Sequence, residues 1–466
     1  MVLWLARGQG HWAAARIGFG FGFGQFAAGL YWTVISTHVY GGAPAWLGIA
    51  LWLVLSAYLA LYPAAALGLA ARAGWLAPRL GALPGLLALW LLAELVRGWF
   101  FTGFPWLTAG YALTGTPFDS LAALGGVFAL TGLMLVWAQA LYAAIAGPAR
   151  RAPVVLLLVS GLGAAALPPG TLWTEAAGSP LDVALVQGNV PQDRKWLPEM
   201  QQPTLDRYRR MSLAAAAAGA ELVVLPEVAV TLPLHRVRNG WLRGLGDELA
   251  ATGSTALVGI SRFEGEVPYN SVLAIGAHGG QYDKRHLVPF GEYFPVPDWV
   301  RPVMQAIGTP YGDVGFGAAR QPRIRVGGLA LSLSICFEDV FGQEVAADAR
   351  DAGLLVNLTN DAWFADSVAP HQHFQIARLR AVETGRPLLR VANTGISAHV
   401  DAAGRVLRRT AQFQTVTLAS RVQPRIGATP YMRWRDLPLW IATVLLLAGL
   451  SLHRRLRARR RGRIPA

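Results

Sequence analysis

The sequence has little charge, one cysteine and two lysines. Of its 466 residues 15% are charged and 53% are hydrophobic, with a mean hydropathy of +0.37. Soluble domains carry about 25% charge, so this composition argues against a wholly cytosolic protein. The lone cysteine, Cys336, excludes a disulfide framework and any cysteine-based zinc or iron–sulfur site. By contrast, 17 tryptophans and 52 glycines fit a membrane protein with aromatic belts and closely packed helices.

Acidic residues are also scarce, with 27 against 41 basic ones and a formal net charge of +14. Thirteen arginines lie in short segments beside apolar runs, and these segments contain no acidic residue. Almost the whole excess of positive charge therefore lies next to expected membrane segments. A nucleic-acid-binding tail is an alternative, but membrane topology accounts better for the pattern, and we expect no nucleic-acid partner. The thirteen are Arg7, Arg16, Arg72, Arg79, Arg150, Arg151, Arg454, Arg455, Arg457, Arg459, Arg460, Arg461 and Arg463.

Six apolar stretches are near the ~20 residues needed to cross a bilayer. With the N-terminus in the cytoplasm, the arginine-rich loops and the tail all fall inside, as the positive-inside rule requires, and the long polar part falls outside. We therefore expect N-terminal membrane helices in 1–168, an external domain in 169–435, a last membrane helix in 436–453 and a basic cytoplasmic tail in 454–466. The stretches are 17–36, 45–69, 83–101, 121–146, 153–167 and 437–452.

Two features inside these stretches indicate helix packing. Small-xxx-small spacing occurs among Gly18, Gly20, Gly22 and Gly24. This spacing predicts that another helix packs closely against the segment. Glu94 and Arg97 are three residues apart, so they should pair on one helix face, either as a structural ion pair or at a lipid headgroup. The polar start of the chain does not read as a cleaved signal peptide.

From residue 181 the pattern changes to short apolar runs that alternate with helical segments. Strand-rich runs are predicted at LDVALVQGN, ELVVLPEVAV, STALVGISR, YNSVLAIG, RIRVGGLALSLSICFED, AGLLVNLTND and PLLRVANTGISAHVDAAGRV. Helices are predicted at 200–220, 236–251 and 373–385. Such a pattern is typical of an α/β domain whose sheets are covered on at least one face. The span 289–317, rich in Pro, Gly and aromatic residues, predicts a long loop that could serve as a lid.

Three residues could carry chemistry. Cys336 ends an apolar strand, where a nucleophile is presented on a fixed backbone, although most lone cysteines simply fill space. Glu227 ends another strand and is the candidate base, with a solvated strand-end acid as the alternative. Lys284 is one of two lysines among 41 basic residues, which indicates a compact ammonium suited to an oxyanion, unless its presence is compositional chance. Glu292 could orient Lys284 or be surface charge.

Other catalytic motifs are missing. The sequence has no G-x-S-x-G, Walker or H-E-x-x-H motif, and His371 and His373 lack a convincing set of further ligands. We therefore expect no metal.

Glu227, Lys284 and Cys336, in this order at strand ends, resemble the triad of the nitrilase, or carbon–nitrogen hydrolase, superfamily. The motifs QGNVPQDRKW, YNS, DKRHLVPFGEYFP, SICFED, TNDAWF and QHFQIARLRAVETGRPLLRVANTGISA, with ELVRGW and TGFPW in the membrane part, resemble the apolipoprotein N-acyltransferase family over residues 17–453. The resemblance implies an α-helical transmembrane bundle that holds a nitrilase-like α-β-β-α sandwich on the periplasmic side of a bacterial inner membrane, with both termini cytoplasmic.

The resemblance also implies transfer of an acyl chain from a phospholipid, through a thioester on Cys336, to the α-amine of a diacylglyceryl-modified cysteine at an apolipoprotein's N-terminus. Glu292 and Glu338 match supporting acids, and Asn270 matches a positioning residue in YNS. Trp196 and Trp363 match tryptophans that could bind acyl chains, with core packing or interfacial anchoring as alternatives. The implied reaction needs no cofactor, because the phospholipid ester already carries the acyl group in reactive form. The partners would be the two lipid substrates and membrane lipids, and a monomer suffices because the site needs one chain.

The sequence departs from the family pattern at two points. Phe337 stands where a tyrosine is expected, so any role of that hydroxyl is absent, and six membrane helices are predicted where about eight are usual. Two other functions stay open at this stage. One is a membrane-anchored amidase or hydrolase of the nitrilase class that uses the same triad with water. The other is a non-catalytic membrane scaffold or transporter, which the intact triad disfavours.

Overall fold

The computed structural model describes residues 1–295, 299 and 313–461, with side chains described as far as residue 457. The chain forms two compact units, each of which is described by itself. The first contains Met1–Tyr31, Ala50–Pro168 and Trp434–Ala466, and the second contains Trp32–Ile49 and Pro169–Arg433. The predicted loop 289–317 lies largely outside the described residues.

Two six-stranded sheets form the centre of the second unit. The first sheet has the order β13-β2-β3-β4-β5-β6, in which β2, β3 and β4 are parallel and the outer pairs are antiparallel. Apolar residues fill its central strands, which are buried on both faces, as expected for the parallel part of a sheet. The strands are β2 (Leu181–Gln187), β3 (Leu222–Val224), β4 (Thr255–Glu264), β5 (Val267–Gly276), β6 (Gly280–Asp283) and β13 (Val416–Val422).

The second sheet has the order β12-β11-β10-β9-β8-β7, and its central strands β8, β9 and β10 are again parallel. A separate antiparallel pair joins β1 (Thr174–Ala176) to β14 (Arg425–Gly427). The strands of the second sheet are β7 (Arg325–Val326), β8 (Leu329–Ile335), β9 (Leu354–Thr359), β10 (Leu388–Ala392), β11 (Ala398–Val400) and β12 (Val406–Arg409).

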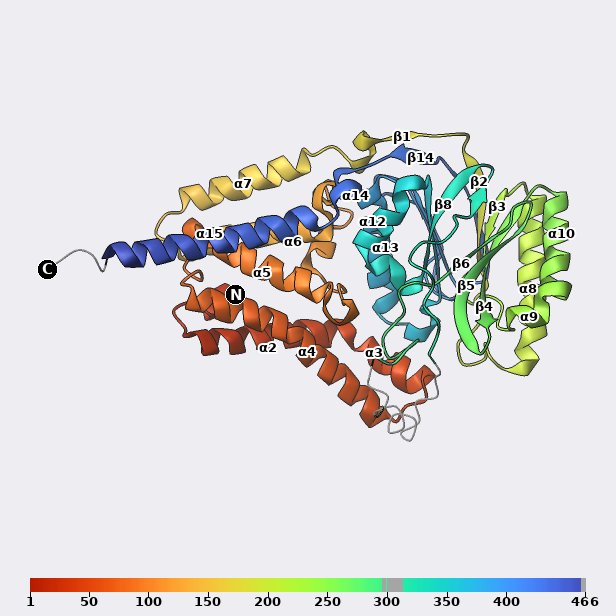
Figure 1. Cartoon of the computed structure of the whole chain (residues 1–466), viewed down its shortest axis with the longest axis horizontal. Coiled ribbons are helices and arrows are strands. Elements are labelled where there is room, and N and C mark those ends of the chain that lie inside the picture. Colours follow the sequence, from red (N-terminus) through yellow and green to blue (C-terminus); the bar gives the residue numbers. More distant parts are fainter. Residues whose placement is uncertain (296–298, 300–312, 462–466) are drawn as a thin grey trace. The chain divides into compact units, whose positions relative to one another are not determined.

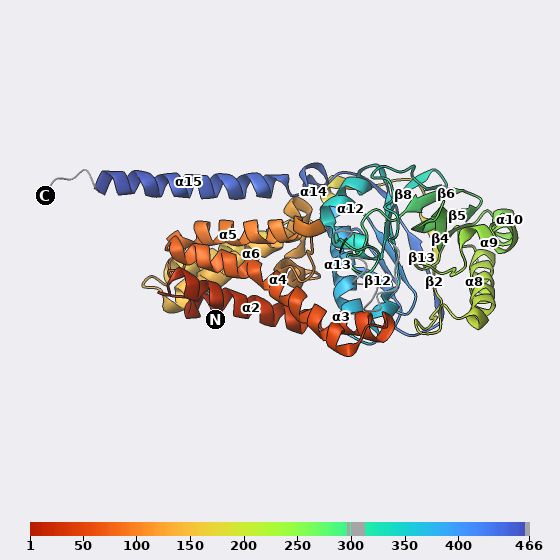
Figure 2. The same ribbon diagram turned by 60° about the horizontal axis from the view of Figure 1, so that its bottom comes forward.

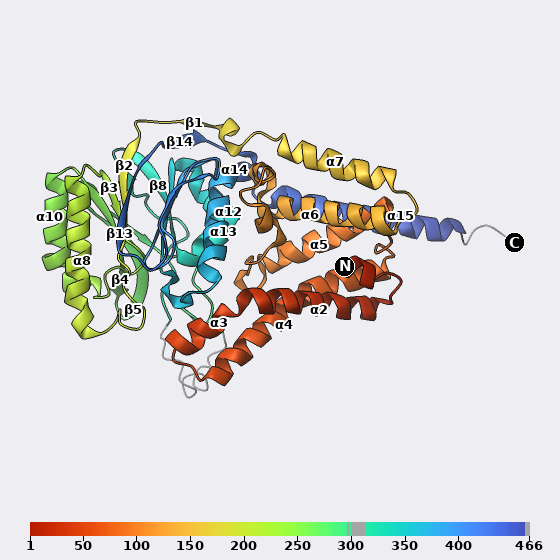
Figure 3. The same cartoon turned by 180° about the vertical axis from the view of Figure 1, so that it is seen from behind.

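Helices cover the outer face of each sheet (Figures 1 and 3). α8 (Pro198–Ala217), α9 (Leu234–Val237) and α10 (Arg243–Ala251) pack on the first sheet through a core that includes Tyr208 and Leu245. α12 (Gly342–Asp348) and α13 (Ala369–Thr384) pack on the second. A third apolar cluster fills the space between the sheets, so the expected α-β-β-α sandwich is confirmed.

The first unit is helical (Figure 2). Four of its helical spans are long and apolar enough to cross a membrane, namely Ala45–Arg72, Leu80–Arg97, Asp119–Ala146 and Leu437–Arg457. Helices also form in the other two predicted stretches: α7 has only 15 residues, and α2 is continuous but contains five glycines. The helices are α1 (Val2–Leu5), α2 (His11–Leu30), α4 (Ala45–Arg72), α5 (Leu83–Arg97), α6 (Ala122–Ala146), α7 (Arg151–Ala165) and α15 (Leu437–Arg461).

One segment departs from a simple division of the chain at residue 168. Trp32–Ile49 contains α3 (Trp32–Val34), the π-helical turn η1 (Ile35–Tyr40) and the first residues of α4, and it groups with the sandwich. The Oγ of Ser36 donates to the carbonyl of Trp363 at 2.9 Å, and the rings of Trp32 and Phe364 are 4.7 Å apart. The segment is therefore part of the wall that holds the turn around Trp363.

The two packing predictions for the membrane part are confirmed. Glu94 and Arg97 form an ion pair, and the buried Arg97 also donates to the carbonyl of Trp106 and the hydroxyl of Thr108, both at 2.9 Å. Gly18 and Gly22 face α4 so closely that a Cβ would lie 2.5 Å from the Pro63 carbonyl oxygen and 2.4 Å from the Pro63 Cγ, respectively.

Gly20 and Gly24 provide a matched test of this packing, because a Cβ on either would meet nothing within 4 Å. We expect Gly18→Ala or Gly22→Ala to lower the free energy of unfolding by about 1–3 kcal/mol through overpacking. Gly20→Ala should be neutral or stabilise by up to about 1 kcal/mol. Thermal denaturation of the detergent-solubilised protein measures both, and equal effects at Gly18 and Gly20 would contradict the assigned interface.

Candidate active site

Glu227 lies in the loop that follows β3, where the predicted strand ends. Its side chain is buried, and the next residue, Val228, has a left-handed backbone with φ 44°. The loop wraps around Gly259 of β4, on which a Cβ would lie 2.2 Å from the Pro226 carbonyl oxygen. Only glycine therefore allows this approach, which fixes the position of the carboxylate.

Lys284 directly follows β6, and its backbone N–H donates to the Asn270 carbonyl at 2.8 Å. The fully buried ammonium donates to Glu292 Oε1 at 2.8 Å and contacts Glu227 Oε1 at 3.4 Å. Burial alone would lower the pKa of Lys284, but the charges of Glu292 and Glu227 outweigh it and raise the pKa above its usual value. Lys284 is therefore a permanent cation.

Asn270 and Glu292 complete this charged group. The Asn270 Nδ2 donates to Glu227 Oε1 at 2.7 Å and to Glu292 Oε1 at 3.2 Å, so one amide bridges the two acids. The other oxygen of Glu292 accepts the backbone N–H of Val288 at 2.8 Å. Both acids are thereby held in fixed orientations around the ammonium.

Cys336 lies at the end of β8 and begins the short turn η8 (Cys336–Val340). Its φ of 52° is unusual for a residue with a side chain, and such strain persists only where neighbouring groups impose it. Burial raises the pKa of the thiol well above its usual value, Glu227 raises it further, and Lys284 opposes the shift. The thiol therefore stays protonated at neutral pH and needs a base to become a nucleophile.

Glu338 braces the two loops that carry Lys284 and Cys336. One carboxylate oxygen accepts the backbone N–H groups of Arg285 at 2.7 Å and His286 at 3.1 Å. The other accepts the Ile335 N–H at 2.7 Å and the Tyr282 hydroxyl at 2.9 Å. Burial raises the pKa of Glu338, although the N–H donors oppose this shift. The carboxylate thus joins the end of β8 to the end of β6.

A second lysine reaches the site and was not among the predicted site residues. The buried Lys195 ammonium donates to the backbone carbonyl of Glu227 at 3.3 Å. Burial lowers the pKa of Lys195 to about 8, with the charge of Glu227 opposing the shift. The sequence offered one signal, the scarcity of lysine, but it did not show that Lys195 lies beside Glu227.

The two tryptophans occupy different places. Trp196 is 52% exposed beside the buried Lys195. Trp363 lies on the turn η10 (Asp361–Phe364), with its ring 6.3 Å from that of Tyr40 and its carbonyl held by Ser36. Phe337 is buried with its ring 5.2 Å from that of Phe341, so apolar packing occupies the position of the expected tyrosine.

The site thus combines a protonated thiol, a carboxylate and a permanent cation. Such a set can abstract the thiol proton, add the sulfur to a carbonyl carbon and stabilise the resulting oxyanion. Within the described ranges, no three or more His, Cys, Asp or Glu side chains are grouped so that they could hold a metal ion.

The sandwich domain belongs to the carbon–nitrogen hydrolase family, whose model matches residues 182–431. The model of the apolipoprotein N-acyltransferase N-terminal domain matches residues 1–141. An apolipoprotein N-acyltransferase of Methylococcus capsulatus is 40% identical over 95% of this chain and 88% of its own length. Those of Azotobacter vinelandii and Pseudomonas putida are 40% and 38% identical, over 95% and 92% of this chain and 87% and 86% of their own. The chain belongs to the apolipoprotein N-acyltransferase family.

The brace formed by Glu338 can be tested with Glu338→Gln. The amide NH₂ must face N–H or O–H donors on one side, and each buried donor left unsatisfied costs about 1–3 kcal/mol. We expect a clear fall in the melting temperature of the purified protein. Glu344→Gln is the matched control, because the half-exposed Glu344 contacts the ring of His286 (Nδ1, 2.9 Å), whereas the brace uses the backbone N–H of that residue. Equal melting temperatures for both variants would rule out the bracing role.

Proposed function

We propose that this chain transfers an acyl chain from a membrane phospholipid to the α-amine of a lipid-modified apolipoprotein. The observation that carries the proposal is the buried Lys284 ammonium held between Glu227 and Glu292, with its charge acting on the thiol of Cys336. The names of the relatives support an acyltransferase with a lipoprotein acceptor. We extend the proposal to the identity of both substrates, a phospholipid donor and a diacylglyceryl-modified acceptor.

In the first half-reaction Glu227 takes the thiol proton as sulfur attacks the ester carbonyl of the donor. Because burial keeps the thiol protonated, proton transfer must accompany attack rather than precede it. Lys284, together with backbone N–H groups, stabilises the tetrahedral oxyanion. The carbonyl–oxygen bond then breaks, and the proton passes from Glu227 to the departing lysophospholipid oxygen. A thioester on Cys336 and a free lysophospholipid result.

In the second half-reaction the acceptor α-amine attacks the thioester. An α-amine has a pKa near about 8, so a useful fraction is neutral at physiological pH. The carbon–nitrogen bond forms, the carbon–sulfur bond breaks, and the amine proton returns through Glu227 to the thiolate of Cys336. Atoms and charges balance without a cofactor, because the donor ester already carries the acyl group in reactive form.

The remaining predicted residues would act around this chemistry. Asn270 would orient both acids, and Glu292 would hold Lys284. Trp363 would line the path of an acyl chain, supported by its contacts with the segment Trp32–Ile49. The exposed Trp196 would contact a lipid substrate.

The first half-reaction can be tested by the mass of the Cys336 peptide after the purified protein is incubated with phospholipid in detergent. We expect a hydroxylamine-labile acyl adduct, because a thioester reacts readily with that nucleophile. Glu227→Gln or Lys284→Met should reduce adduct formation by at least about 100-fold, as expected for loss of a base or an oxyanion donor. Glu344→Gln, outside the site, should leave it unchanged.

Two outcomes would contradict the proposal. Free fatty acid accumulating without an adduct in the presence of acceptor would favour a hydrolase in which water resolves the thioester. No adduct and no released fatty acid from the unaltered protein would argue against phospholipid as the donor.

We also propose a multi-pass inner-membrane topology with the sandwich in the periplasm, supported by the arginine distribution and four membrane-capable helical spans. In a Cys336→Ser background, cysteines introduced by Glu266→Cys and Ala149→Cys probe the exposed β4–β5 turn and the segment next to Arg150. A membrane-impermeant maleimide should label Glu266→Cys in intact spheroplasts and Ala149→Cys only after lysis. The reverse pattern would invert the topology.

A further inference from the structure

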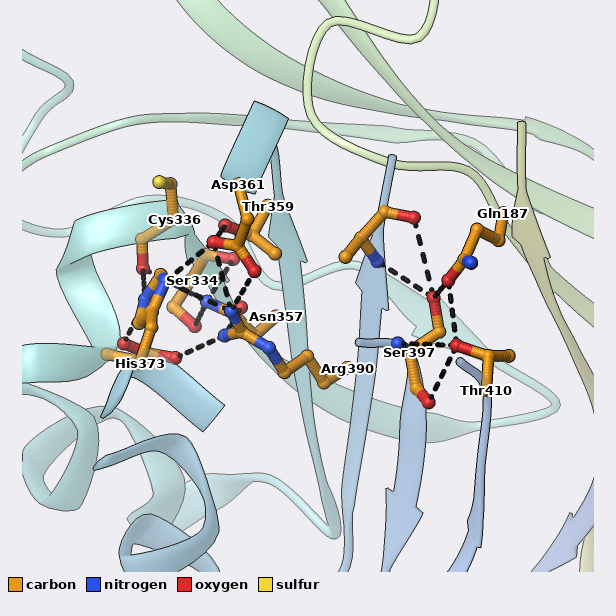
Figure 4. Close-up of polar contacts among 12 residues, drawn as sticks. Gln187, Ser334, Cys336, Asn357, Thr359, Asp361, His373, Arg390, Ser397 and Thr410 are labelled. Carbon is orange, nitrogen blue, oxygen red and sulfur yellow. Dashed lines mark hydrogen bonds and ion pairs between the residues drawn. The ribbon is translucent and has the colours of Figure 1, made fainter. Parts of the chain in front are cut away.

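Behind Cys336 lies a cluster of four buried ionisable side chains that the proposed chemistry does not use. Figure 4 labels Asp361, His373 and Arg390 among them. They come from four elements: Asp339 from η8, Asp361 from η10, His373 from α13 and Arg390 from β10. None is more than 2% exposed. We call these four residues the rear cluster.

The contacts of the rear cluster form a closed ring. His373 Nε2 lies 2.9 Å from Asp339 Oδ1, and His373 Nδ1 lies 2.9 Å from Asp361 Oδ1. Arg390 donates to Asp339 Oδ2 at 3.1 Å and to Asp361 Oδ2 at 3.0 Å. Each carboxylate is therefore shared by the imidazole and the guanidinium.

Charge arithmetic constrains the protonation of His373. Two carboxylates and one guanidinium leave one negative charge in a site closed to water, which is costly. An imidazolium makes the sum zero (−2 + 1 + 1) and supplies an N–H toward each carboxylate. It also places two cations together, because His373 Nδ1 lies 3.0 Å from Arg390 Nη2, and the Asp361 carboxylate that contacts both offsets their repulsion. The rear cluster is therefore neutral only when His373 carries a charge.

The rear cluster also holds the nucleophile by its backbone. His373 Nε2 lies 3.3 Å from the Cys336 carbonyl oxygen, and Asn357 Nδ2 donates to the same oxygen at 3.2 Å. Asn357 in turn accepts a hydrogen bond from Arg390 at 2.8 Å. In Figure 4 the Cys336 carbonyl points toward His373, whereas the sulfur points away from the ring. These contacts with the carbonyl of Cys336 thus hold its backbone at the strained φ of 52°.

We propose that the rear cluster is a positioning unit for Cys336, in which charged His373 holds the nucleophile's carbonyl and leaves no net charge beneath the thiol. The proposal rests on the assignment of Cys336 as the nucleophile of the proposed acyl transfer. It assigns Asp339, Asp361, His373 and Arg390 a role in setting thiol reactivity, through Cys336 rather than through contact with substrate.

The titration behaviour of these groups agrees with the geometry. Burial and Arg390 by themselves lower the pKa of His373, but Asp339 and Asp361 outweigh them and raise it to about 9. Burial would raise the pKa of Asp361, but Arg390 and His373 hold it at about 2. Because the pKa of His373 is raised on folding, its stabilising contribution is complete below pH 6.5 and is lost as pH rises through about 9.

The test is the rate of iodoacetamide alkylation of the single cysteine between pH 6.5 and 9, without lipid. The charged groups that act on the thiol are Glu227, Lys284 and Asp361, and all three stay in place in His373→Gln. That variant leaves a net negative charge in the rear cluster, so thiolate formation should require a pH about one unit higher. At fixed pH, alkylation should be about 10-fold slower.

Adding Asp339→Asn to His373→Gln restores neutrality, since Asp361 and Arg390 then balance. We expect the double variant to reverse at least half of the shift of the alkylation profile that His373→Gln causes. If both substitutions only disturbed the structure, their effects on the alkylation rate would add. His399→Gln is the matched control, because His399 is equally buried in the second sheet and contacts Ser420 Oγ at 2.7 Å, away from the rear cluster. It should leave the alkylation profile unchanged.

Each outcome bears on the proposal. An unshifted profile in folded His373→Gln, or a double variant slower than the single one, overturns it. If His373→Gln fails to fold, a folded and reactive double variant supports charge balance, and an unfolded double variant overturns it. The acyl-adduct assay is a separate readout. A missing adduct in the unaltered protein refutes the proposed donor reaction while the alkylation profile still decides the role of the rear cluster.

Discussion

The pairing of the Lys284 ammonium with Glu292 and Glu227 is the interaction on which the rest of the site depends. A buried ammonium is tolerated only where carboxylates and hydrogen-bond acceptors replace water. Here they come from loops that follow separate segments of the chain, so ion pairing joins the end of β3 to the end of β6. Asn270 and Glu338 extend these links to β5 and β8. The thiol of Cys336 therefore lies among groups that hydrogen bonds and ion pairs already hold in place, as the proposed transfer requires of its base and its oxyanion donor.

Much of this arrangement could be predicted from the sequence. Apolar runs that end in Glu227 and Cys336 predict strand ends, and both residues do follow a strand. Their strands, β3 and β8, belong to different sheets, so only the packing of the two sheets brings them together. The scarcity of lysine pointed to Lys284, and the spacing of Gly18 and Gly22 predicted a helix contact. The edge strands β6, β12 and β13 were not predicted, because they are short or largely exposed and obtain their stability from partners distant in sequence, as β13 does from β2.

The rear cluster could not be predicted for a different physical reason. His373 was considered as a metal ligand because of its spacing from His371, but its true partners lie on three other elements. Sequence spacing reports neighbours on one helix or strand and carries no information about which strand lies behind a turn. Lys195 illustrates the same limit, since only the fold brings its ammonium to the carbonyl of Glu227.

One short turn, η10, contacts both the rear cluster and the segment Trp32–Ile49. The turn η10 carries Asp361 at its first position and Trp363 two residues later, so one short element faces both the rear cluster and the segment that precedes most of α4 in the chain. Ser36, Trp32 and Tyr40 hold its outer side, while His373 and Arg390 hold its inner side. A displacement of Trp363 by an acyl chain would therefore be resisted by ion pairs that also fix the carbonyl of Cys336. Because buried ion pairs depend steeply on geometry, this shared turn makes the position of Trp363 and the position of Cys336 interdependent.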